Sequence, residues 1–213
     1  MTEYVILVDS DDNAIGTEEK VKCHLPDGRL HRAFTALLFD KGGRLALARR
    51  DPQKMLWPGC WDGTFASHPR ESETYVSSGQ RRMPEEVGIS GTLEYLHKFE
   101  YHVPYKDVGS ENEICGTLVG VTDAELKSIP GEIDEIRWVT PDELLSGMRS
   151  DPGIYCPWML IALRLFGRSN AAVLEGRANI LSAWTDTIND ALDEAIACHL
   201  PPDKWRIIDE RQH

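Results

Sequence analysis

Short apolar runs separated by turn residues dominate the first two thirds of the chain. The clearest example is Ala33–Phe39 (AFTALLF), which is followed by Asp40-Lys41-Gly42-Gly43 and then by Arg44–Ala48 (RLALA). Runs of this length are typical of strands, and a turn of Asp and Gly between two of them predicts a β-hairpin. A β-sheet is therefore the first expectation for the fold.

Further apolar runs lie on both sides of this hairpin. They predict strands at Tyr4–Asp9, Trp61–Ser67, Thr92–Val103, Glu113–Val121 and Ile133–Val139. Helices are predicted at Pro141–Met148 and Pro157–Phe166, because a proline fits the first turn of a helix. Glu71–Val87 is helix-prone, but Gly79 and Pro84 weaken that prediction. Mixed strands with few helices predict an α/β (α+β) domain.

Beyond Gly167 the pattern changes to that of an amphipathic helix. Apolar residues recur at helical spacing between Ala171 and His199, at Leu174, Leu181, Trp184, Ile188, Leu192 and Ile196. We therefore expect a domain at residues 1–167 and a C-terminal helical extension at 168–213, ended as a helix by Pro201-Pro202. The extension either packs on the domain or mediates a homodimer.

Composition excludes several classes of function. The formal net charge of -12 disfavours a nucleic-acid or anionic-membrane surface, although a local basic pocket can still bind a small anion. No apolar run reaches the ~18 residues that a membrane span needs. The first residues lack the pattern of a secretory signal, and the cysteines are odd in number without a C-x-x-C pair. These features predict a cytoplasmic protein with reduced thiols.

Three histidines and two glutamates are candidates for one metal site. His24 and His31 flank a short turn, His68 ends a predicted strand, and Glu111 and Glu113 share one face if their segment is extended. Three imidazoles and two carboxylates suit an octahedral divalent ion such as Mn²⁺, Mg²⁺ or Zn²⁺. Spacing alone is weak evidence, because such residues more often lie on a solvated surface or cap a turn.

The segment from Ser67 to Ile89 carries a second pattern. It ends in Arg81-Arg82-Met83-Pro84-Glu85-Glu86-Val87-Gly88-Ile89, with Glu73 eight residues before Arg81. This resembles the Nudix box, G-x5-E-x7-R-E-U-x-E-E-x-G-U, where U is aliphatic. Ser67 replaces the leading glycine, and Arg82 replaces a glutamate. In that family the box is a loop and helix whose carboxylates bind Mg²⁺ on a diphosphate, which suits a hard cation.

Taken together, the motifs resemble type I isopentenyl-diphosphate isomerases, a branch of the Nudix superfamily. The resemblance spans roughly Tyr4–Phe166. It rests on Lys20…His24, Arg29-Leu30-His31-Arg32-Ala33-Phe34, Trp57-Pro58-Gly59-x-Trp61, Ser67-His68-Pro69, Arg81-Arg82…Glu85-Glu86-x-Gly88, Glu111-Asn112-Glu113 and Pro157-Trp158-Met159. It implies a Nudix-type mixed β-sheet sandwiched by helices, and an enzyme of isoprenoid or terpenoid metabolism.

The resemblance also implies roles for individual residues. The ligands of one divalent ion would be His24, His31, His68, Glu111 and Glu113. A Mg²⁺ ion held with the diphosphate would be bound by Glu86. The substrate-binding residues would be Lys20, Arg50, Lys54, Arg82 and Trp61, of which the four cations clamp the phosphates. Tyr101 would help Glu113 deliver a proton, and Trp158 would stabilise a carbocation through its aromatic face.

One position departs from the family at the centre of its chemistry. The isomerases carry a catalytic cysteine two residues before the histidine of the His-Pro pair, and this chain has Ala66 there. A methyl group can neither donate nor accept a proton. The binding residues are therefore present, while one of the two groups that exchange protons with the alkene is missing.

We therefore expect an isomerase-like enzyme that protonates a prenyl diphosphate through Glu113 and then cyclises or rearranges the carbocation. Three alternatives stay open. The chain is an isopentenyl-diphosphate isomerase with an altered acid–base pair, in which Thr64, Ser67 or Cys115 takes over. It is a Nudix diphosphate hydrolase, which Arg82 disfavours. Or it is a non-catalytic partner that binds prenyl diphosphates.

Overall fold

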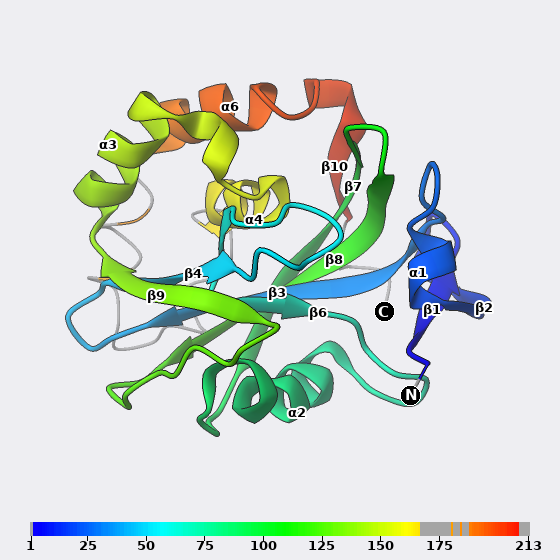
Figure 1. Ribbon diagram of the computed structural model, residues 1–213, viewed down its shortest axis with the longest axis horizontal. Helices are drawn as coiled ribbons and strands as arrows, with labels where there is room; N and C mark the ends of the chain where they lie inside the picture. The colour runs from blue at the N-terminus through cyan, green and yellow to red at the C-terminus, as the bar shows by residue number, and fades with distance from the viewer. Residues whose placement is uncertain (1, 167–179, 181–183, 185–187, 209–213) are drawn as a thin grey trace.

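A ten-stranded mixed sheet organises the computed structural model, which describes residues 2–166, 180, 184 and 188–208 (Figure 1). The strand order is β10-β7-β8-β3-β1-β2, with β6 and β4 also on β3, and with β5 and β9 on β4. The strands are β1 (Tyr4–Val8), β2 (Ala14–Glu19), β3 (His31–Phe39), β4 (Leu45–Arg50), β5 (Trp61–Asp62), β6 (Phe65–Ser67), β7 (Glu94–Tyr105), β8 (Gly109–Val121), β9 (Ile133–Val139) and β10 (Trp205–Ile208).

Helices cover both faces of the sheet. They are α1 (Lys20–Cys23), α2 (Tyr75–Val87), α3 (Pro141–Ser150), α4 (Pro157–Phe166) and α6 (Asn189–Ala197). In Figure 1, α2 lies below the sheet and α3, α4 and α6 lie above it. Strand β3 supplies both cores: Leu37 and Phe39 pack with the α4 side, while Phe34 and Leu38 pack with the α2 side. The predicted mixed sheet between helices is confirmed.

The pairing of the central strands brings distant residues into one row. In the parallel pair β3 and β8, His31 lies opposite Glu113, and in the antiparallel pair β7 and β8, Tyr101 lies opposite the same Glu113. Directly opposed residues on one face have Cβ atoms only ~5 Å apart. Three strands therefore place an imidazole, a carboxylate and a phenol side by side.

Helix α2 forms despite the two residues that weakened its prediction. Thr74 caps it in a capping box with Ser77, and Gly88 ends it in the left-handed conformation. A Cβ atom on Gly79 would lie 2.4 Å from Leu118 of β8, so the glycine lets the helix approach the sheet closely. The doubt about this helix was wrong, because tertiary packing outweighs the local cost of glycine.

Other differences from the predicted elements are local. The hairpin of β3 and β4 is confirmed. The predicted strand at Trp61–Ser67 is instead two short strands, broken at Gly63, where a Cβ atom would lie 3.1 Å from the carbonyl oxygen of Ala36. Strand β2 was missed because most of its residues are exposed, so it lacks the apolar alternation of a half-buried strand.

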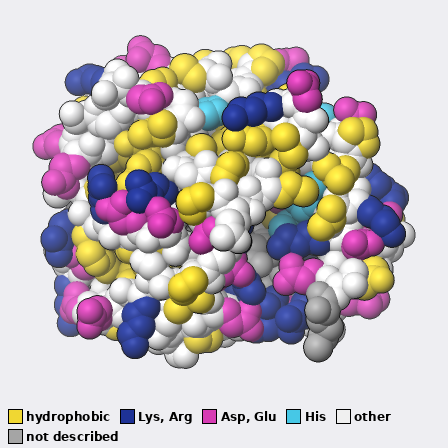
Figure 2. Space-filling model, viewed as in Figure 1, with side chains coloured by type: hydrophobic (Ala, Val, Ile, Leu, Met, Phe, Trp, Pro, Cys, Tyr) yellow, Lys and Arg dark blue, Asp and Glu magenta, His cyan; other side chains and the backbone are white. Residues whose placement is uncertain are grey.

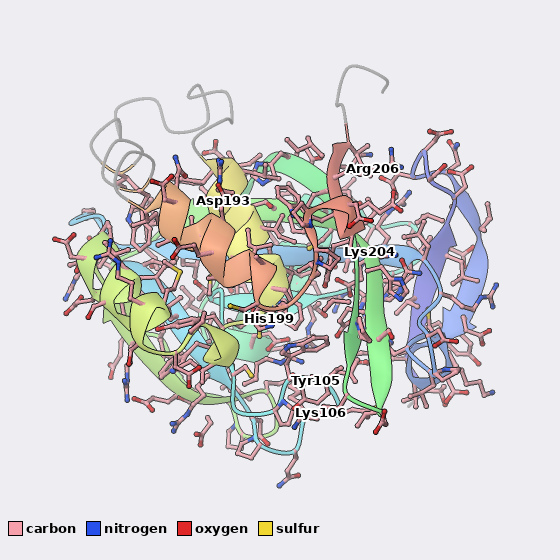
Figure 3. The ribbon with its side chains drawn as sticks, turned by 90° about the horizontal axis from the view of Figure 1, so that it is seen from above. Tyr105, Lys106, Asp193, His199, Lys204 and Arg206 are labelled. Atoms are coloured by element: carbon pink, nitrogen blue, oxygen red, sulfur yellow. The ribbon has the colours of Figure 1, made fainter. Side chains whose placement is uncertain are left out.

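Only part of the predicted C-terminal helix lies within the described residues. Helix α6 packs beside α4, where Arg164 forms a salt bridge with Asp193, and β10 lies beside β7 (Figure 3). Leu192 and Ile196 are buried in the core below, as is Trp184, whose indole N–H donates to the carbonyl oxygen of Gly43 (2.7 Å). Leu174 and Leu181 lie outside the described residues.

The division at residue 167 and the homodimer stay predictions. Within the described part of the chain, no helix is long and apolar enough to cross a membrane.

Candidate functional site

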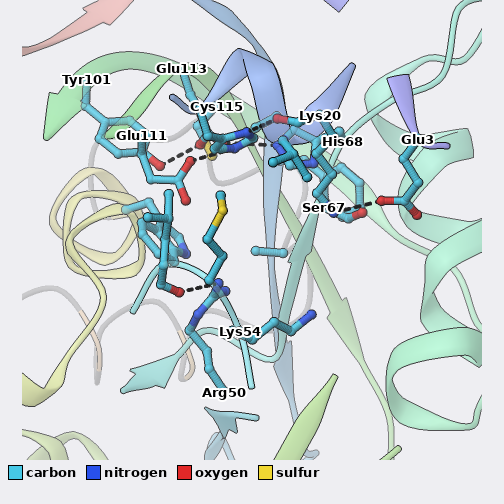
Figure 4. Close-up of a pocket in the computed structure, with 18 of the residues that line it drawn as sticks. Glu3, Lys20, Arg50, Lys54, Ser67, His68, Tyr101, Glu111, Glu113 and Cys115 are labelled. Carbon is cyan, nitrogen blue, oxygen red and sulfur yellow. Dashed lines mark hydrogen bonds and ion pairs between the residues drawn. The ribbon is translucent and has the colours of Figure 1, made fainter. Parts of the chain in front are cut away.

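A cavity of about 330 Å³ opens on the α4 side of the sheet, beside α1 (Figure 4). Its lining comes from β3, β6, β7, β8, the segment 50–56 and the start of α4. On the surface, histidine side chains are visible in a hollow bordered by hydrophobic and basic side chains (Figure 2). The cavity thus combines titratable, cationic and aromatic groups.

Four of the predicted ligands converge at one end of this cavity. The ligand atoms of His24, His31, His68 and Glu113 all lie within 4.8 Å of one another. His24 follows α1, His31 begins β3, His68 follows β6, and Glu113 lies in β8. The sheet thus joins four separate segments around a space of a size suited to a single ion.

Backbone carbonyls fix which ring nitrogen carries a proton in two of these histidines. Nδ1 of His24 lies 2.6 Å from the carbonyl oxygen of Lys20, and Nδ1 of His31 lies 2.8 Å from that of Arg29. Because a carbonyl oxygen only accepts, Nδ1 carries the proton in both rings. The Nε2 atoms therefore turn their lone pairs into the cluster, as in metal-binding histidines.

The Nε2 atom of His31 shows that the cluster needs a positive charge. It is buried, has no hydrogen-bond partner among the described residues, and lies 3.4 Å from Oε1 of Glu113. A neutral imidazole would place its lone pair against a carboxylate oxygen, which is unfavourable in a buried site. A divalent cation or an extra proton removes this conflict, so the donor set fits a metal ion.

The pKa values of the clustered histidines also indicate that the cluster needs a positive charge. Burial alone would lower the pKa of His31, but the adjacent Cys23 and the charge of the Glu113 carboxylate raise it to about 10. Burial, aided by the charges of Lys20 and His31, holds the pKa of His68 well below its ordinary value. Without an ion, one imidazole is thus protonated to balance the carboxylate.

Glu111, the fifth predicted ligand, adjoins the four. Its Oε2 atom lies 3.0 Å from Nε2 of His24, is buried, and has no hydrogen-bond partner in the described part of the chain. An unpartnered buried carboxylate oxygen beside an inward lone pair again suits a cation between them. Glu111 is therefore placed to join the cluster.

Tyr101 contacts the cluster from β7. Its hydroxyl donates to Oε2 of Glu113 over 2.5 Å, and burial beside that carboxylate keeps the pKa of Tyr101 well above its ordinary value. Burial would raise the pKa of Glu113, but the nearby His31 and the hydrogen bond from Tyr101 outweigh this and lower it. The phenol thus stays protonated and holds one oxygen of Glu113 in place.

Trp158 faces the same cavity from the first turn of α4. Its ring is buried and lies edge-on to Trp57, with a centroid distance of 5.3 Å, and 6.3 Å from the ring of Tyr101. The cavity therefore has an aromatic wall near the acid and the phenol. Such a wall attracts a cation through the negative face of its π-system.

Three of the predicted phosphate-binding cations line the cavity. Each is already ion-paired with a carboxylate of the chain: Lys20 with Glu3 (2.9 Å), Arg50 with Asp62 (3.2 Å), and Lys54 with Glu132. Neither Glu3 nor Glu132 was singled out in the sequence, because nothing local marks an acidic residue as the partner of a distant cation.

Arg82 and Glu86 lie next to the cavity rather than in its wall. Arg82 contacts Glu86 and lies 3.1 Å from Glu132. Glu86 is buried and lines a small adjoining cavity that also touches Lys54 and Ala66. The predicted Mg²⁺ ligand therefore lies beside the cations expected to bind the diphosphate.

Trp61 is the predicted substrate-binding residue that the structure places elsewhere. It does not line the cavity among the residues described here. Its ring lies instead near the guanidinium groups of Arg49 (5.7 Å) and Arg137 (4.8 Å). A direct contact of this ring with a ligand in the cavity is therefore not supported by its position.

Ala66 lies where the main and the small cavity meet, because it lines both. Of the residues that could replace a cysteine there, Thr64 is already used: its hydroxyl donates to Ala46 and accepts from Leu38. Cys115 does line the main cavity, and burial with the nearby Glu113 charge keeps its pKa well above the ordinary value. Its thiol is thus protonated.

Comparison with known proteins identifies close relatives. One isopentenyl-diphosphate Delta-isomerase, from Haloarcula marismortui, is 41% identical over 172 residues, which cover 76% of this chain and 90% of that protein. Another, from Clavibacter sepedonicus, is 35% identical over 175 residues, which cover 80% of this chain and 91% of that protein.

The fold has a solved counterpart in the crystal structure of DR0079 from Deinococcus radiodurans. That structure matches with a TM-score of 0.63 and 22% identity, and covers 76% of this chain and 98% of its own. A family model described as NUDIX domain matches residues 29–159. By domain and by sequence, the chain therefore belongs to the NUDIX superfamily and, within it, to the family of isopentenyl-diphosphate Delta-isomerases.

Proposed function

We propose that the chain is an isopentenyl-diphosphate-isomerase-like enzyme that protonates the alkene of a prenyl diphosphate with Glu113. The observation that carries the proposal is the surroundings of this carboxyl group. It meets three histidines on one side and the Tyr101 hydroxyl on the other, in a cavity that also holds Trp158 and basic side chains. An acid, a cation-stabilising wall and phosphate-binding groups are what this chemistry needs.

The cluster of His24, His31, His68, Glu111 and Glu113 would hold a divalent ion, Mn²⁺, Mg²⁺ or Zn²⁺. When bound, that ion supplies Lewis acidity, which makes a proton on a coordinated ligand more acidic. The chain itself orients Glu113, since Tyr101 donates to one oxygen and the histidines crowd the other. A Mg²⁺ ion at Glu86 would accompany the diphosphate beside Lys54 and Arg82.

In the proposed reaction Glu113 first takes up a proton from solvent, and its carboxyl group then transfers that proton to the alkene, whose π-electrons form the new C–H bond. The resulting tertiary carbocation lies against the face of Trp158 and loses a proton later to the Glu113 carboxylate or to a diphosphate oxygen. Ala66 offers no base on the other face of the alkene. We therefore propose that the carbocation is first attacked by a second alkene or rearranges, giving a cyclic or rearranged prenyl diphosphate.

A second candidate is simple isomerisation of isopentenyl to dimethylallyl diphosphate. The names of the relatives favour it, and Cys115 supplies a thiol in the cavity. This thiol lies two residues from Glu113 on the same strand. Glu113 would therefore add a proton to the alkene and Cys115 would remove another from the same face.

The test incubates the protein with Mg²⁺ and five-, ten- or fifteen-carbon prenyl diphosphates in D₂O, with mass spectrometry of the products. We expect deuterium in a cyclic or rearranged product with the diphosphate retained. Deuterium in dimethylallyl diphosphate alone would favour the second candidate. Released phosphate without deuterium, or binding without any product, would contradict both.

A further inference from the structure

Asp62 is a buried carboxylate to which the reaction above gives no part. It ends β5 and is only 3% exposed. Burying a carboxylate is costly unless charges and hydrogen bonds compensate, and burial accordingly raises the pKa of Asp62. Its partners therefore explain why it is there.

Those partners are two groups of the cavity wall. One oxygen of Asp62 accepts hydrogen bonds from the indole N–H of Trp158 (2.7 Å) and from the backbone N–H of Gly63 (2.7 Å). The other accepts from the guanidinium of Arg50 (3.2 Å). Because donors occupy both oxygens, Asp62 is not free to act as the missing base.

Trp158 and Arg50 also face each other. The centre of the Arg50 guanidinium lies 5.2 Å from the centroid of the Trp158 ring. A carbocation against this ring would therefore form close to a fixed positive charge. In a dry cavity that repulsion is only weakly screened, so a neutralising carboxylate matters more there than in water.

The carboxylate acts on the indole as well. A negative acceptor at the N–H group polarises the ring and makes its face more negative, which strengthens its attraction for a cation. The same hydrogen bond restricts the ring to one orientation. Asp62 thus joins three effects: it holds the aromatic wall, polarises it, and offsets the charge of Arg50.

We propose that Asp62 is a positioning residue that prepares Trp158 and Arg50 to stabilise the carbocation. This inference rests on the proposed function, because the carbocation is that of the proposed reaction. The inference distinguishes the position of the Arg50 guanidinium from the neutralisation of its charge. Backbone carbonyls of Leu56 (3.0 Å) and Trp57 (3.1 Å) also hold the guanidinium, so it stays in the wall even without the Asp62 charge.

The first test is Asp62→Asn, which keeps the shape and loses the charge. We expect kcat to fall ~10–30-fold, as for the loss of a desolvated cation–π contribution of about 2 kcal/mol. KM and the affinity for inorganic diphosphate should stay the same or improve, since Arg50 loses its counter-charge. The matched control is Asp134→Asn, a partly exposed partner of Arg49, which should leave both constants unchanged.

The second test asks whether Asp62 acts through the indole N–H. The Trp158→Phe background lacks that group. In this background, Asp62→Asn should lower log kcat by at most about a third of the decrease that it causes in the native protein. Equal losses in both backgrounds, or a rise in KM without a fall in kcat, would overturn the inference. Should Asp62→Asn not fold, Asp62→Glu, which displaces the charge, serves in the same cycle.

The outcomes separate this inference from the proposed function. If the native protein incorporates no deuterium from D₂O into any prenyl diphosphate, the proposed function fails and takes this inference with it. If the native protein turns over and Asp62→Asn keeps its kcat, only the role of Asp62 is refuted.

Discussion

The two ends of the cavity differ in whether the chain itself balances their charges. At the cluster of His24, His31, His68 and Glu113, lone pairs face one another, and the buried Nε2 of His31 has no hydrogen-bond partner in the part of the chain that the structure describes. At the end proposed to bind the diphosphate, Lys20, Arg50 and Lys54 each already contact a carboxylate of the chain. The first end is incomplete without a cation, while the second is electrically balanced without a ligand.

This difference suggests that one end of the cavity determines turnover and the other determines the affinity for the substrate. A preformed set of inward lone pairs binds an ion with little rearrangement, because carbonyls and strands already hold the rings. A diphosphate must instead compete with internal carboxylates such as Glu3 and Glu132 for the cations. Alternatively, it would bind together with Mg²⁺, and these carboxylates would bind the Mg²⁺. We therefore expect variants at the cluster to affect turnover, and variants at the cations to affect mainly KM.

The largest effect is expected for Glu113→Gln. Glutamine keeps the shape but cannot give a proton to the alkene, so deuterium incorporation should fall ~10²–10⁴-fold. Affinity for inorganic diphosphate, measured by calorimetry, should change little, because that end of the cavity is untouched. Turnover near the native rate would remove Glu113 from the reaction.

Ala66→Cys should produce a gain of a similar order, up to ~10²–10⁴-fold, in conversion of isopentenyl to dimethylallyl diphosphate. It places a thiol where the two cavities meet. Ala66→Ser, of similar size with a less acidic group, is the matched control and should gain far less. Brisk isomerisation by the native protein would mean that another group, such as Cys115, already acts there.

Lys54→Ala is expected to raise KM for the prenyl diphosphate ~10–100-fold with kcat within a few-fold of native. One charged hydrogen bond to a phosphate is worth about 1.5–3 kcal/mol. Lys41→Ala, which removes an exposed lysine paired with Asp123, is the control and should have no effect. A fall in kcat with constant KM would break the proposed separation of the two ends.

The smallest effect is expected for Glu3→Gln. It frees Lys20 from its partner, so affinity for the diphosphate should rise by no more than ~fivefold, since an exposed ion pair contributes ~0.2–1 kcal/mol. Titration with inorganic diphosphate at low salt measures the change. Weaker binding would show that Glu3 holds Lys20 in place instead of competing for it.

The sequence predicted the sheet well because its signals are local. Apolar runs and turn residues mark β3 and β4, and a first-turn proline marks α3 and α4. The prediction failed where distant packing decides: Gly79 looks like a helix breaker, yet it allows α2 to approach Leu118. The exposed strand β2 has no apolar alternation to read.

The site divides in the same manner. The histidines and glutamates were found as an ordered set of motifs, since spacing alone could not select them. Their acidic neighbours were missed, because Glu132 lies 78 residues from Lys54, and Asp62 lies 96 residues from Trp158. Only the folded chain shows that these carboxylates contact the cations and the aromatic wall.

The metal content of the protein tests the central claim most directly. The claim is that the cluster around His31 and Glu113 is a preformed cation site on which turnover depends. Protein purified without chelator should carry about one tightly held divalent ion per chain, and His31→Ala should lose it while Lys54→Ala keeps it. Native protein that is free of metal, yet turns over prenyl diphosphates at an undiminished rate in excess chelator, would contradict the account.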